Sequence, residues 1–381
     1  MAAVTPPFTE ELEDFRQVVR RWVANELRPH AAEWEEARWF PNEVFVKCAE
    51  QGYLGLKYPA EYGGSDGGYL ADAVFAEELA RCGSGGLAAG IGAHTSIATP
   101  PVWKFGTEEQ KQRYLVPAIA GEKIAALAIT EPDAGSDVAA VKTRAERVEG
   151  GFVVNGAKTY ITNGVRADFL VTAVKTTAEG GHHGISFLIV DRGEGVHSSK
   201  LEKMGWHASD TAEIAFDDVF VPEENLLGPE HEGFKLIMAN FQWERLLMAL
   251  GAVGAMEFAV ERTIAFCRER RAFGRPLTGH QVVSHKLVDL ATTAHTGRTL
   301  TYDALRRFTD GENAVKEVTM AKLFTQRASF EVMDTCLQLH GGAGYMREYD
   351  IERAARDARL GPIGGGSDEI MREILTKVLA L

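Results

Sequence analysis

The stretch Ala128-Ile129-Thr130-Glu131-Pro132-Asp133-Ala134-Gly135-Ser136-Asp137 marks a change in the character of the sequence. Before it, from about residue 9 to residue 121, apolar residues recur at the spacing of α-helices. After it, short runs of β-branched and aromatic residues alternate with loops of Gly, His, Asp and Pro, which predicts strands. In the stretch itself, Gly135 and Ser136 could offer hydrogen-bond donors to an acceptor-rich ligand. From composition alone, an ordinary Asp-rich turn is the simpler interpretation.

The strand-like region predicts a small β unit. A run at residues 152–154, the pair Asn155-Gly156 and a second run at residues 157–161 have the pattern of a β-hairpin with an Asn-Gly turn. Three further strands are expected at residues 169–174, 185–190 and 212–221, each bounded by turn-forming residues.

Helical patterns occupy both ends of the chain. Near the N-terminus, apolar residues between 15 and 23 fall at helical spacing, and residues 71–80 and 107–120 continue the pattern. Three long helices are expected toward the C-terminus, at residues 233–268, 284–309 and 315–339. The order predicts an α+β protein of three domains: an N-terminal helical domain at 1–125, a middle β-barrel or sheet domain at 126–230 and a C-terminal four-helix bundle at 231–381.

Composition narrows the range of functions. Of 381 residues, 41 are Lys or Arg and 54 are Asp or Glu, and this acidic balance argues against nucleic-acid binding. The four cysteines are far apart and form no CxxC pair, so we expect reduced thiols in a cytoplasmic protein and no metal site. No secretion signal is expected from the first ten residues. The longest uncharged stretch, residues 82–103, is rich in glycine, which suits a cavity wall or helix packing better than a membrane span.

Three further motifs carry groups that cofactors use. Tyr160 and Thr162 stand two positions apart on a strand, so both could stack on and hydrogen-bond to a planar ring. The segment Arg270-Arg271-Ala272-Phe273-Gly274, followed by His280-Gln281, could hold a pyrophosphate. The segment Gln338-Leu339-His340-Gly341-Gly342-Ala343-Gly344 gives only weak support for a dinucleotide fold, because it follows no strand. Each motif alone also fits a core strand, a solvated helix end or a helix break.

In this order and spacing, the motifs resemble the acyl-CoA dehydrogenase family over nearly the whole chain. The resemblance rests on the opening stretch and on further segments: Gly106-Thr107-Glu108-Glu109-Gln110, Lys203-Met204-Gly205-Trp206 with Ser209-Asp210-Thr211, Arg271-Ala272-Phe273-Gly274, residues 338–344 and residues 364–372. It implies a helical domain, a β domain and a C-terminal helical bundle, assembled as a homotetramer. It also implies FAD as the cofactor, lying partly across a subunit interface.

The resemblance indicates which residues hold FAD. Thr130, Ser136 and Thr162 would hydrogen-bond to the flavin ring. The positions that match this side of the cofactor are Leu127, Ile129, Thr130, Gly135, Ser136, Tyr160 and Thr162. A second group matches positions that hold FAD at the subunit interface, contributed to the neighbouring subunit's cofactor: Arg270, Phe273, His280, Gln281, Gln338, Gly341 and Gly342. Ser367 and Glu369 match the last cofactor contacts, and Ser367 also has the pattern of a helix cap.

The chain departs from the commonest family pattern at the catalytic base. Many members carry the catalytic glutamate in a Tyr-Glu-Gly-Thr segment near the C-terminus, but the matching residue here is Gly365. Glu244 offers a replacement, because it shares an apolar helix face with Ile237 and Phe241. Burial there raises the pKa of a carboxyl group towards that of a general base. Long-chain and isovaleryl-CoA dehydrogenases resemble this chain in both respects; without the glycine, a Glu244 held by Arg245 would be the simpler interpretation.

The implied reaction is FAD-dependent oxidation of the α,β carbon–carbon bond of an acyl-CoA thioester to the trans-2-enoyl-CoA, as in fatty-acid β-oxidation. Glu244 would remove the α-proton, and the backbone N–H of Gly365 would stabilise negative charge on the thioester oxygen. An electron-transferring flavoprotein would accept the electrons. The positions expected to contact the substrate are Ser136, Phe241, Arg245, Gly364, Gly365 and, in a separate loop, His183.

The acyl group is left open by the sequence. Small residues between 83 and 98 could line a deep pocket for medium or long acyl chains, or could pack helices tightly. The segment around Glu244 favours medium or long chains, but a branched short-chain substrate of the isovaleryl type is the alternative. An oxidase or monooxygenase on the same fold would show sustained oxygen consumption. A non-catalytic FAD- or acyl-CoA-binding subunit is a further alternative, against which the intact Glu244 argues.

Overall fold

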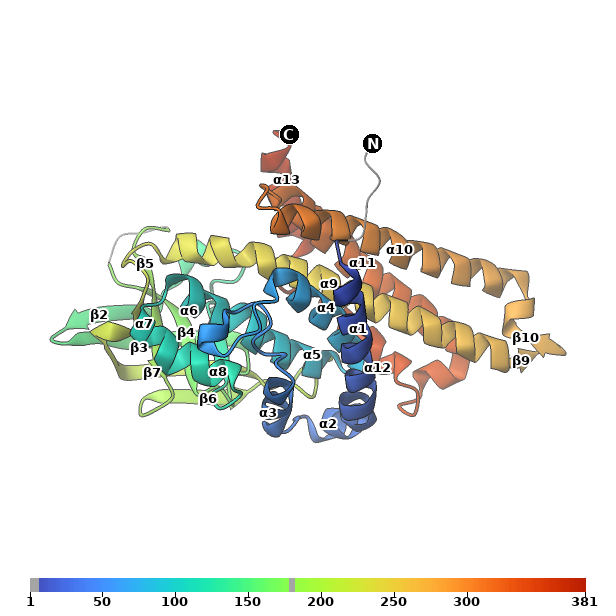
Figure 1. Cartoon of the computed structure of the whole chain (residues 1–381), viewed down its shortest axis with the longest axis horizontal. Helices are drawn as coiled ribbons and strands as arrows, with labels where there is room; N and C mark the ends of the chain where they lie inside the picture. Colours follow the sequence, from blue (N-terminus) through green and yellow to red (C-terminus); the bar gives the residue numbers. More distant parts are fainter. Residues whose placement is uncertain (1–6, 178–181) are drawn as a thin grey trace.

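The computed structural model describes residues 7–177 and 182–381, and its elements follow the order helices, strands, helices (Figure 1). The first helical part confirms the patterns at residues 71–80 and 107–120. Thr107 begins the second of these with a capping box in which its side chain and that of Gln110 exchange hydrogen bonds with each other's backbone. The helices of this part are α1 (Glu10–Trp22), α2 (Ala31–Ala37), α3 (Glu43–Glu50), α4 (Gly68–Leu79), α5 (Gly85–Gly92), α6 (Thr99–Phe105), α7 (Glu108–Gln110) and α8 (Val116–Ile119), with π-helical turns η1 (Val23–Leu27), η5 (Ala93–Ala98) and η6 (Lys111–Leu115).

The middle part is a mixed sheet that confirms the three separate strand predictions. Its strands are β1 (Ala125–Ala128), β2 (Arg144–Val148), β3 (Gly151–Thr162), β4 (Phe169–Lys175), β5 (Ile185–Asp191), β6 (Val196–Lys200), β7 (Thr211–Pro222) and β8 (Leu226–Leu227). They are arranged in the order β6-β7-β3-β2-β4-β5-β8, and β1 adds to β4 in parallel. The two faces of β4 and β5 are buried in separate cores, one shared with the N-terminal helices and one within the sheet.

The hairpin expected around Asn155-Gly156 is wrong, because both residues lie inside the single strand β3. Asn155 lacks the left-handed φ that an Asn-Gly hairpin turn requires. The register of β3 against β7 instead shifts between Val154 and Gly156, so the pair forms a bulge. A Cβ at Gly156 would stand 2.6 Å from Thr143 Oγ1, which explains the glycine. The actual hairpin turn joins β2 to β3 through Gly150, at a φ of 77°.

The C-terminal part confirms the three long helices, α9 (Gly233–Glu269), α10 (Gln281–Thr309) and α11 (Val315–His340). A short hairpin of β9 (Arg271–Ala272) and β10 (Arg275–Pro276) joins the first two, and α12 (Ile351–Ala358) and α13 (Asp368–Val378) follow. In Figure 1, α9 runs from the sheet through the molecule to the far end, where β9 and β10 lie. This helix therefore connects the sheet to the distal end of the bundle. The domain limits at residues 125 and 230 stay a prediction.

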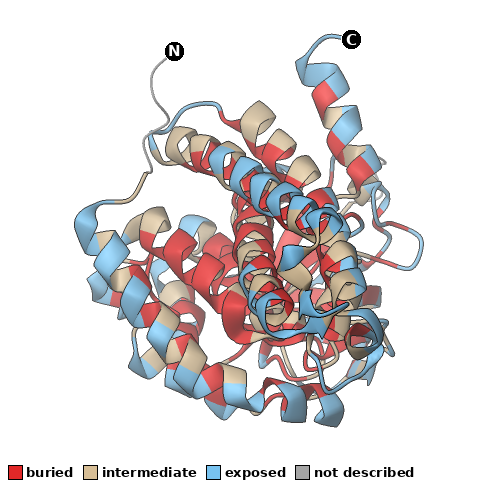
Figure 2. Ribbon diagram, turned by 90° about the vertical axis from the view of Figure 1, so that its right-hand side faces the viewer, coloured by how far each residue is buried: buried red, intermediate tan, exposed pale blue. Residues whose placement is uncertain are grey.

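Buried residues gather where the helices pack on one another, and exposed residues cover their outer faces (Figure 2). All four cysteines are buried and free of disulfides in the described part of the chain. Within residues 7–177 and 182–381, no helix combines the length and the apolar character that crossing a bilayer requires.

Candidate active site

A cavity of about 1210 Å³ lies where the sheet, the first helical part and the C-terminal helices meet. It brings together most of the residues that the sequence singled out, from segments more than 200 residues apart. The sheet side contributes Leu127, Ile129, Thr130, Gly135, Ser136, Tyr160 and Thr162, α9 contributes Phe241, Glu244 and Arg245, and the loop before α13 contributes Gly364, Gly365 and Ser367.

Glu244 reaches the cavity from the first half of α9. Its Oε2 is shielded from solvent and has no hydrogen-bond partner among the described residues. Burial raises the pKa of Glu244 to about 7, while the charges of Arg245 and Lys322 limit the rise. The interpretation in which Arg245 merely holds Glu244 finds no support, since no hydrogen bond or ion pair joins them in the described chain; Arg245 instead stands over the Phe241 ring, 5.5 Å from its centroid. An unpaired carboxyl group that titrates near neutrality can accept a proton.

The glycine loop passes directly beside this carboxyl group. Gly365 and Gly366 have φ values of 61° and 87°, in the left-handed region that favours glycine. A Cβ at Gly365 would stand 2.2 Å from Met248 Sδ and 3.7 Å from Glu244 Oε1. Met248 therefore occupies the space that a side chain at position 365 would need, and the backbone of Gly365 approaches Glu244 closely. Ser367 caps α13 as predicted, its hydroxyl accepting a hydrogen bond from Ile370 N.

Tyr160 and Thr162 both line the cavity, although by a different geometry from that expected. Simple strand alternation is interrupted, because the β3–β7 register shifts between Lys158 and Ile161 and Tyr160 has a φ of 59°. Tyr160 is 71% exposed. A strained residue that presents an aromatic ring to a cavity is a common feature of binding sites. The neighbouring turn is fixed by Glu131, which pairs with buried Lys158 at 2.7 Å.

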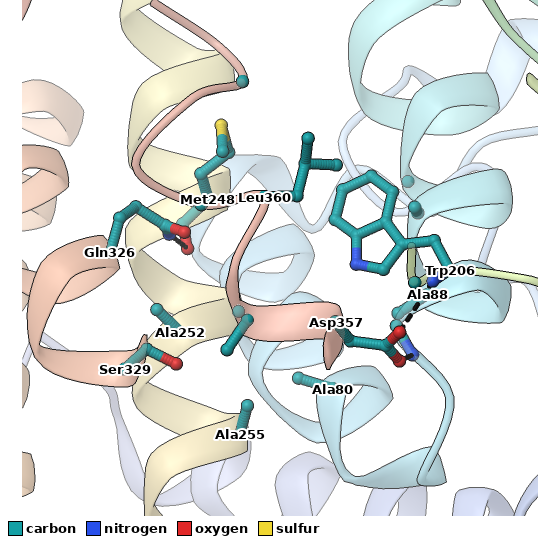
Figure 3. A pocket seen from close by; sticks show the side chains of 18 of the residues that line it. Ala80, Ala88, Trp206, Met248, Ala252, Ala255, Gln326, Ser329, Asp357 and Leu360 are labelled. Atoms are coloured by element: carbon teal, nitrogen blue, oxygen red, sulfur yellow. Dashed lines mark hydrogen bonds between the residues drawn. The ribbon is translucent and has the colours of Figure 1, made fainter. Parts of the chain in front are cut away.

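Small residues form the far wall of the cavity. Figure 3 shows the short side chains of Ala80, Ala88, Ala252 and Ala255 around the space, with Trp206 on one side of the view. The glycine-rich stretch also borders it, so the cavity-wall interpretation of residues 83–98 is correct for these members: Gly83, Ser84, Gly85, Ala88, Ala89, Gly92, Ala93, Thr95, Ser96 and Ile97. They come from α5 and its neighbouring turns, opposite α9.

Comparison with known proteins identifies the family. Three family models match in sequence: "Acyl-CoA dehydrogenase, N-terminal domain" at residues 9–122, "middle domain" at 126–219 and "C-terminal domain" at 231–380. The chain belongs to the acyl-CoA dehydrogenase family. It is 38% identical to the mitochondrial long-chain specific acyl-CoA dehydrogenase of Mus musculus, over 97% of this chain and 86% of that protein.

Two further members place this acyl-CoA dehydrogenase among its relatives. The mitochondrial isovaleryl-CoA dehydrogenase of Solanum tuberosum is 37% identical over 98% of this chain and 91% of the relative. The crystal structure of a probable acyl-CoA dehydrogenase from Mycobacterium abscessus has a TM-score of 0.95 and 43% identity, and covers 98% of this chain and 100% of that chain. Solved structures of the same fold include complexes with FAD.

The cofactor of this acyl-CoA dehydrogenase is FAD, and the sheet side of the cavity has the groups to hold a flavin. Thr130, Ser136 and Thr162 bring hydroxyl groups to the same wall as the Tyr160 ring. A Cβ at Gly135 would meet no atom within 4 Å, so the backbone of this turn faces open space and can approach a ligand. Which of these groups contact FAD stays a prediction.

The second predicted FAD group lies at the distal end of the helical bundle; its members do not line the cavity, although the adjacent residues Glu269 and His340 do. It consists of Arg270, Phe273, His280, Gln281, Gln338, Gly341 and Gly342. Along α9, Glu244 and Arg270 are about 39 Å apart at the rise of an α-helix. Phe273 is 97% exposed. The role of this group at the FAD of a neighbouring subunit stays a prediction.

Two further predicted positions, apart from the distal group, lie outside the lining of the cavity. Glu369 is in the first turn of α13, two residues after Ser367. His183 is exposed in the loop before β5, stacked near His182, which packs 5.3 Å from the Phe234 ring at the start of α9. The expected contacts of Glu369 with FAD and of His183 with the substrate therefore stay predictions.

Several lining or supporting residues were not predicted from the sequence. Trp206 borders the cavity, and its backbone N–H donates to Asp357 Oδ1 at 2.6 Å. Gln326 donates to the Met248 carbonyl at 2.7 Å, and Lys322 donates to two carbonyls of the glycine loop. The signal for Lys322 was a lysine among Val318, Ala321 and Thr325 on an otherwise buried helix face.

Proposed function

We propose that this acyl-CoA dehydrogenase oxidises medium- or long-chain acyl-CoA thioesters to trans-2-enoyl-CoA, with Glu244 as the catalytic base. The observation that carries the proposal is the unpaired carboxyl group of Glu244, which has a pKa near 7 and lies beside the backbone of Gly365. A base of this strength is half ionised at neutral pH, which suits removal of a proton from carbon next to a thioester.

In the proposed reaction, the residues around Glu244 bind the thioester and stabilise the charge that develops on it. When the thioester carbonyl lies beside Gly365, the backbone N–H of Gly365 donates to the carbonyl oxygen, on which negative charge develops. Glu244 then takes the α-proton, and the buried guanidinium of Arg245 adds positive charge beside the same site. FAD, when bound, supplies the acceptor for the hydride from the β-carbon. Ser136 and Phe241 line the cavity and are proposed substrate contacts, as is His183 outside it.

The preference for medium or long acyl chains rests on the shape of the cavity. Between α5 and α9 its walls include several glycines and alanines beside larger residues such as Leu247, and Cβ atoms added at Gly92 or Gly251 would meet no atom closer than 3.8 Å. Such walls leave room for an acyl tail beyond the reacting carbons. A branched short-chain substrate would leave much of this apolar space unfilled, which is why the isovaleryl alternative is the second candidate.

The assembly and the partners form the second part of the proposal. The exposed distal group at Arg270 and Gln338 supports a homotetramer in which each subunit helps to hold a neighbour's FAD. We propose an electron-transferring flavoprotein as electron acceptor. The buried, unpaired cysteines fit a reducing compartment and so support a cytoplasmic location.

The test is anaerobic bleaching of the bound flavin by octanoyl-, palmitoyl- and isovaleryl-CoA. The natural chain is expected to bleach fastest with one of the two straight-chain substrates. Glu244→Gln removes the base and is expected to slow bleaching by at least about a hundredfold. Stopped-flow absorbance at the flavin band measures both rates.

The matched control is Glu257→Gln, on the same helix. Glu257 is partly buried, and its pKa is also raised by burial, but it pairs with Arg298 and lies outside the cavity lining. This variant should bleach like the natural chain. Equal bleaching by Glu244→Gln would remove Glu244 from the role of base. Fastest bleaching by isovaleryl-CoA would favour the branched alternative, and sustained oxygen consumption would favour an oxidase.

A further inference from the structure

Lys322 is a fully buried lysine on α11 that reaches the glycine loop. Its Nζ donates to the carbonyl oxygen of Gly361 at 3.0 Å and to that of Gly366 at 2.6 Å. These two carbonyls stand on either side of Gly364 and Gly365. The lysine therefore holds both ends of the short segment that contains the proposed N–H donor.

The bonding of Lys322 is unusual for a buried cation. Its hydrogen bonds within the described chain go to backbone carbonyls, although a buried charge normally requires a charged partner. The charges that face it are Glu244 and Arg245 from α9, and Asp368 and Glu369 from the start of α13. Asp368 is itself bonded by Arg327 of α11 at 2.8 Å. Lys322 thus lies between the proposed base and the first turn of α13.

The charge of Lys322 also acts on Glu244. It lowers the pKa of that carboxyl group, together with Arg245 and against the effect of burial. Burial lowers the pKa of Lys322 itself to about 8, so the ammonium group is present at neutral pH. With a neutral side chain at position 322, Arg245 would remain as the cation that lowers the pKa of Glu244.

We propose that Lys322 is a positioning residue for the dehydrogenation. It fixes the loop so that the N–H of Gly365 faces the thioester carbonyl, and its charge favours the ionised form of Glu244. One side chain on α11 thereby couples the two groups that act on the α-carbon, one through geometry and one through electrostatics. The inference rests on the function proposed above, because it requires Glu244 to be the base.

The test compares three variants of the FAD-bound protein. Lys322→Met keeps the length of the side chain but removes the charge and the donors. Lys322→Arg keeps the charge but replaces the compact ammonium with a planar fork that fits the two carbonyls differently. Thr319→Val is the matched control, since Thr319 is buried on the same helix and its hydroxyl donates to the Val315 carbonyl.

Two measurements separate positioning from general damage. The first is the rate constant of flavin reduction at saturating palmitoyl-CoA, together with the Kd of that substrate. The second needs no turnover: an infrared titration of the protonated carboxyl band that disappears in Glu244→Gln. It reports the midpoint at which Glu244 ionises in each variant.

Lys322→Met is expected to lower the rate constant by about tenfold or more while the Kd changes little, because the misplaced loop affects the transition state. Its infrared midpoint should move to higher pH. Lys322→Arg should keep the midpoint of the natural chain but lose rate, and Thr319→Val should match the natural chain in both. A Lys322→Met protein with unchanged midpoint and rate overturns the inference.

If Lys322→Met does not fold, the rate constant and the infrared midpoint of Lys322→Arg test the inference instead. A lower rate constant at an unchanged midpoint supports positioning, whereas the natural rate constant overturns it. Failure of the proposed function has a different signature. In that case Glu244→Gln itself bleaches normally, while the infrared titration still shows whether the charge of Lys322 reaches Glu244.

Discussion

The ionisation of Glu244 predicts how the enzyme depends on pH. The pKa of Glu244 is raised from 4.5 to about 7, so the carboxyl group is protonated and inactive as a base on the acid side of neutrality. The second-order rate constant for flavin reduction should therefore rise about tenfold per pH unit below pH 7 and level off above it. Stopped-flow reduction between about pH 5.5 and pH 8 measures this profile. A constant that is already level at pH 5.5 would contradict it, because an ordinary glutamate is ionised there.

The sequence predicts Glu244 as a candidate base, but it does not predict the residues that surround its carboxyl group. The missing glutamate at Gly365 drew attention to a second carboxyl group on an apolar helix face, and the cavity contains both positions. Lys322 could not be assigned in this way, since its partners are backbone carbonyls 39 and 44 residues away in sequence. Met248 acquires its importance only because the loop folds against it. Contacts of this kind leave no periodic signal in a sequence.

The periodicity of apolar residues predicts the long helices and the isolated strands, but it does not predict the course of β3. An Asn-Gly pair between two apolar runs normally signals a hairpin turn. Here β3 continues through it, because β2 and β7 pair with it on either side and a bulge absorbs the extra residue. The same strand has a second irregularity before Ile161, which presents Tyr160 to the cavity. Both features depend on neighbouring strands, and so local sequence cannot predict them.

The pairing of α5 with α9 across the cavity predicts a change in acyl-chain preference. Gly251 lies two turns beyond Glu244 on α9, and a Cβ there would meet no atom within 4 Å. Gly251→Leu should fill part of the tail space and also favour the helix. We expect reduction by palmitoyl-CoA to slow by at least about tenfold and reduction by butyryl-CoA to stay near that of the natural chain.

The comparison of the two substrates controls for damage to the site, and Gly251→Ala should give a smaller effect in the same direction. Stopped-flow reduction with both substrates measures the ratio. Equal slowing of butyryl-CoA and palmitoyl-CoA would show that Gly251 does not border the acyl tail.

The whole molecule keeps the two predicted groups of FAD residues apart, one on the sheet side of the cavity and one at the distal end of the helical bundle. The order of the three parts was readable from the sequence because the periodicity changes from helix to strand and back. The cavity was not, because it needs residues from all three parts at once. Glu244 and Arg270 are about 39 Å apart along α9 at the rise of an α-helix, and the assembly that would use the distal group stays a proposal.

The contact between the first and last parts of the chain predicts how stability depends on a buried ion network. Arg16 of α1 pairs with Glu77 of α4, and Tyr302 of α10 donates to the same carboxylate at 2.9 Å. Arg16→Met leaves Glu77 buried without its nearest cation, which should lower the free energy of unfolding by about 3–5 kcal/mol. Thermal unfolding of the FAD-bound protein measures the loss. The matched control, Arg21→Met, removes an exposed guanidinium from the same helix and should cost less than about 0.5 kcal/mol.

The pH dependence of this loss separates an ion pair from simple packing. Burial raises the pKa of Glu77 and Arg16 lowers it, so in Arg16→Met the folded-state pKa of Glu77 rises further above that of the unfolded chain. The folded variant then binds a proton more tightly than the unfolded one, and its stability falls as pH rises through that range. The deficit relative to the natural chain should therefore be larger at pH 8 than at pH 5. The same deficit at both values would mean that Arg16 stabilises the junction of α1, α4 and α10 by packing rather than by its charge.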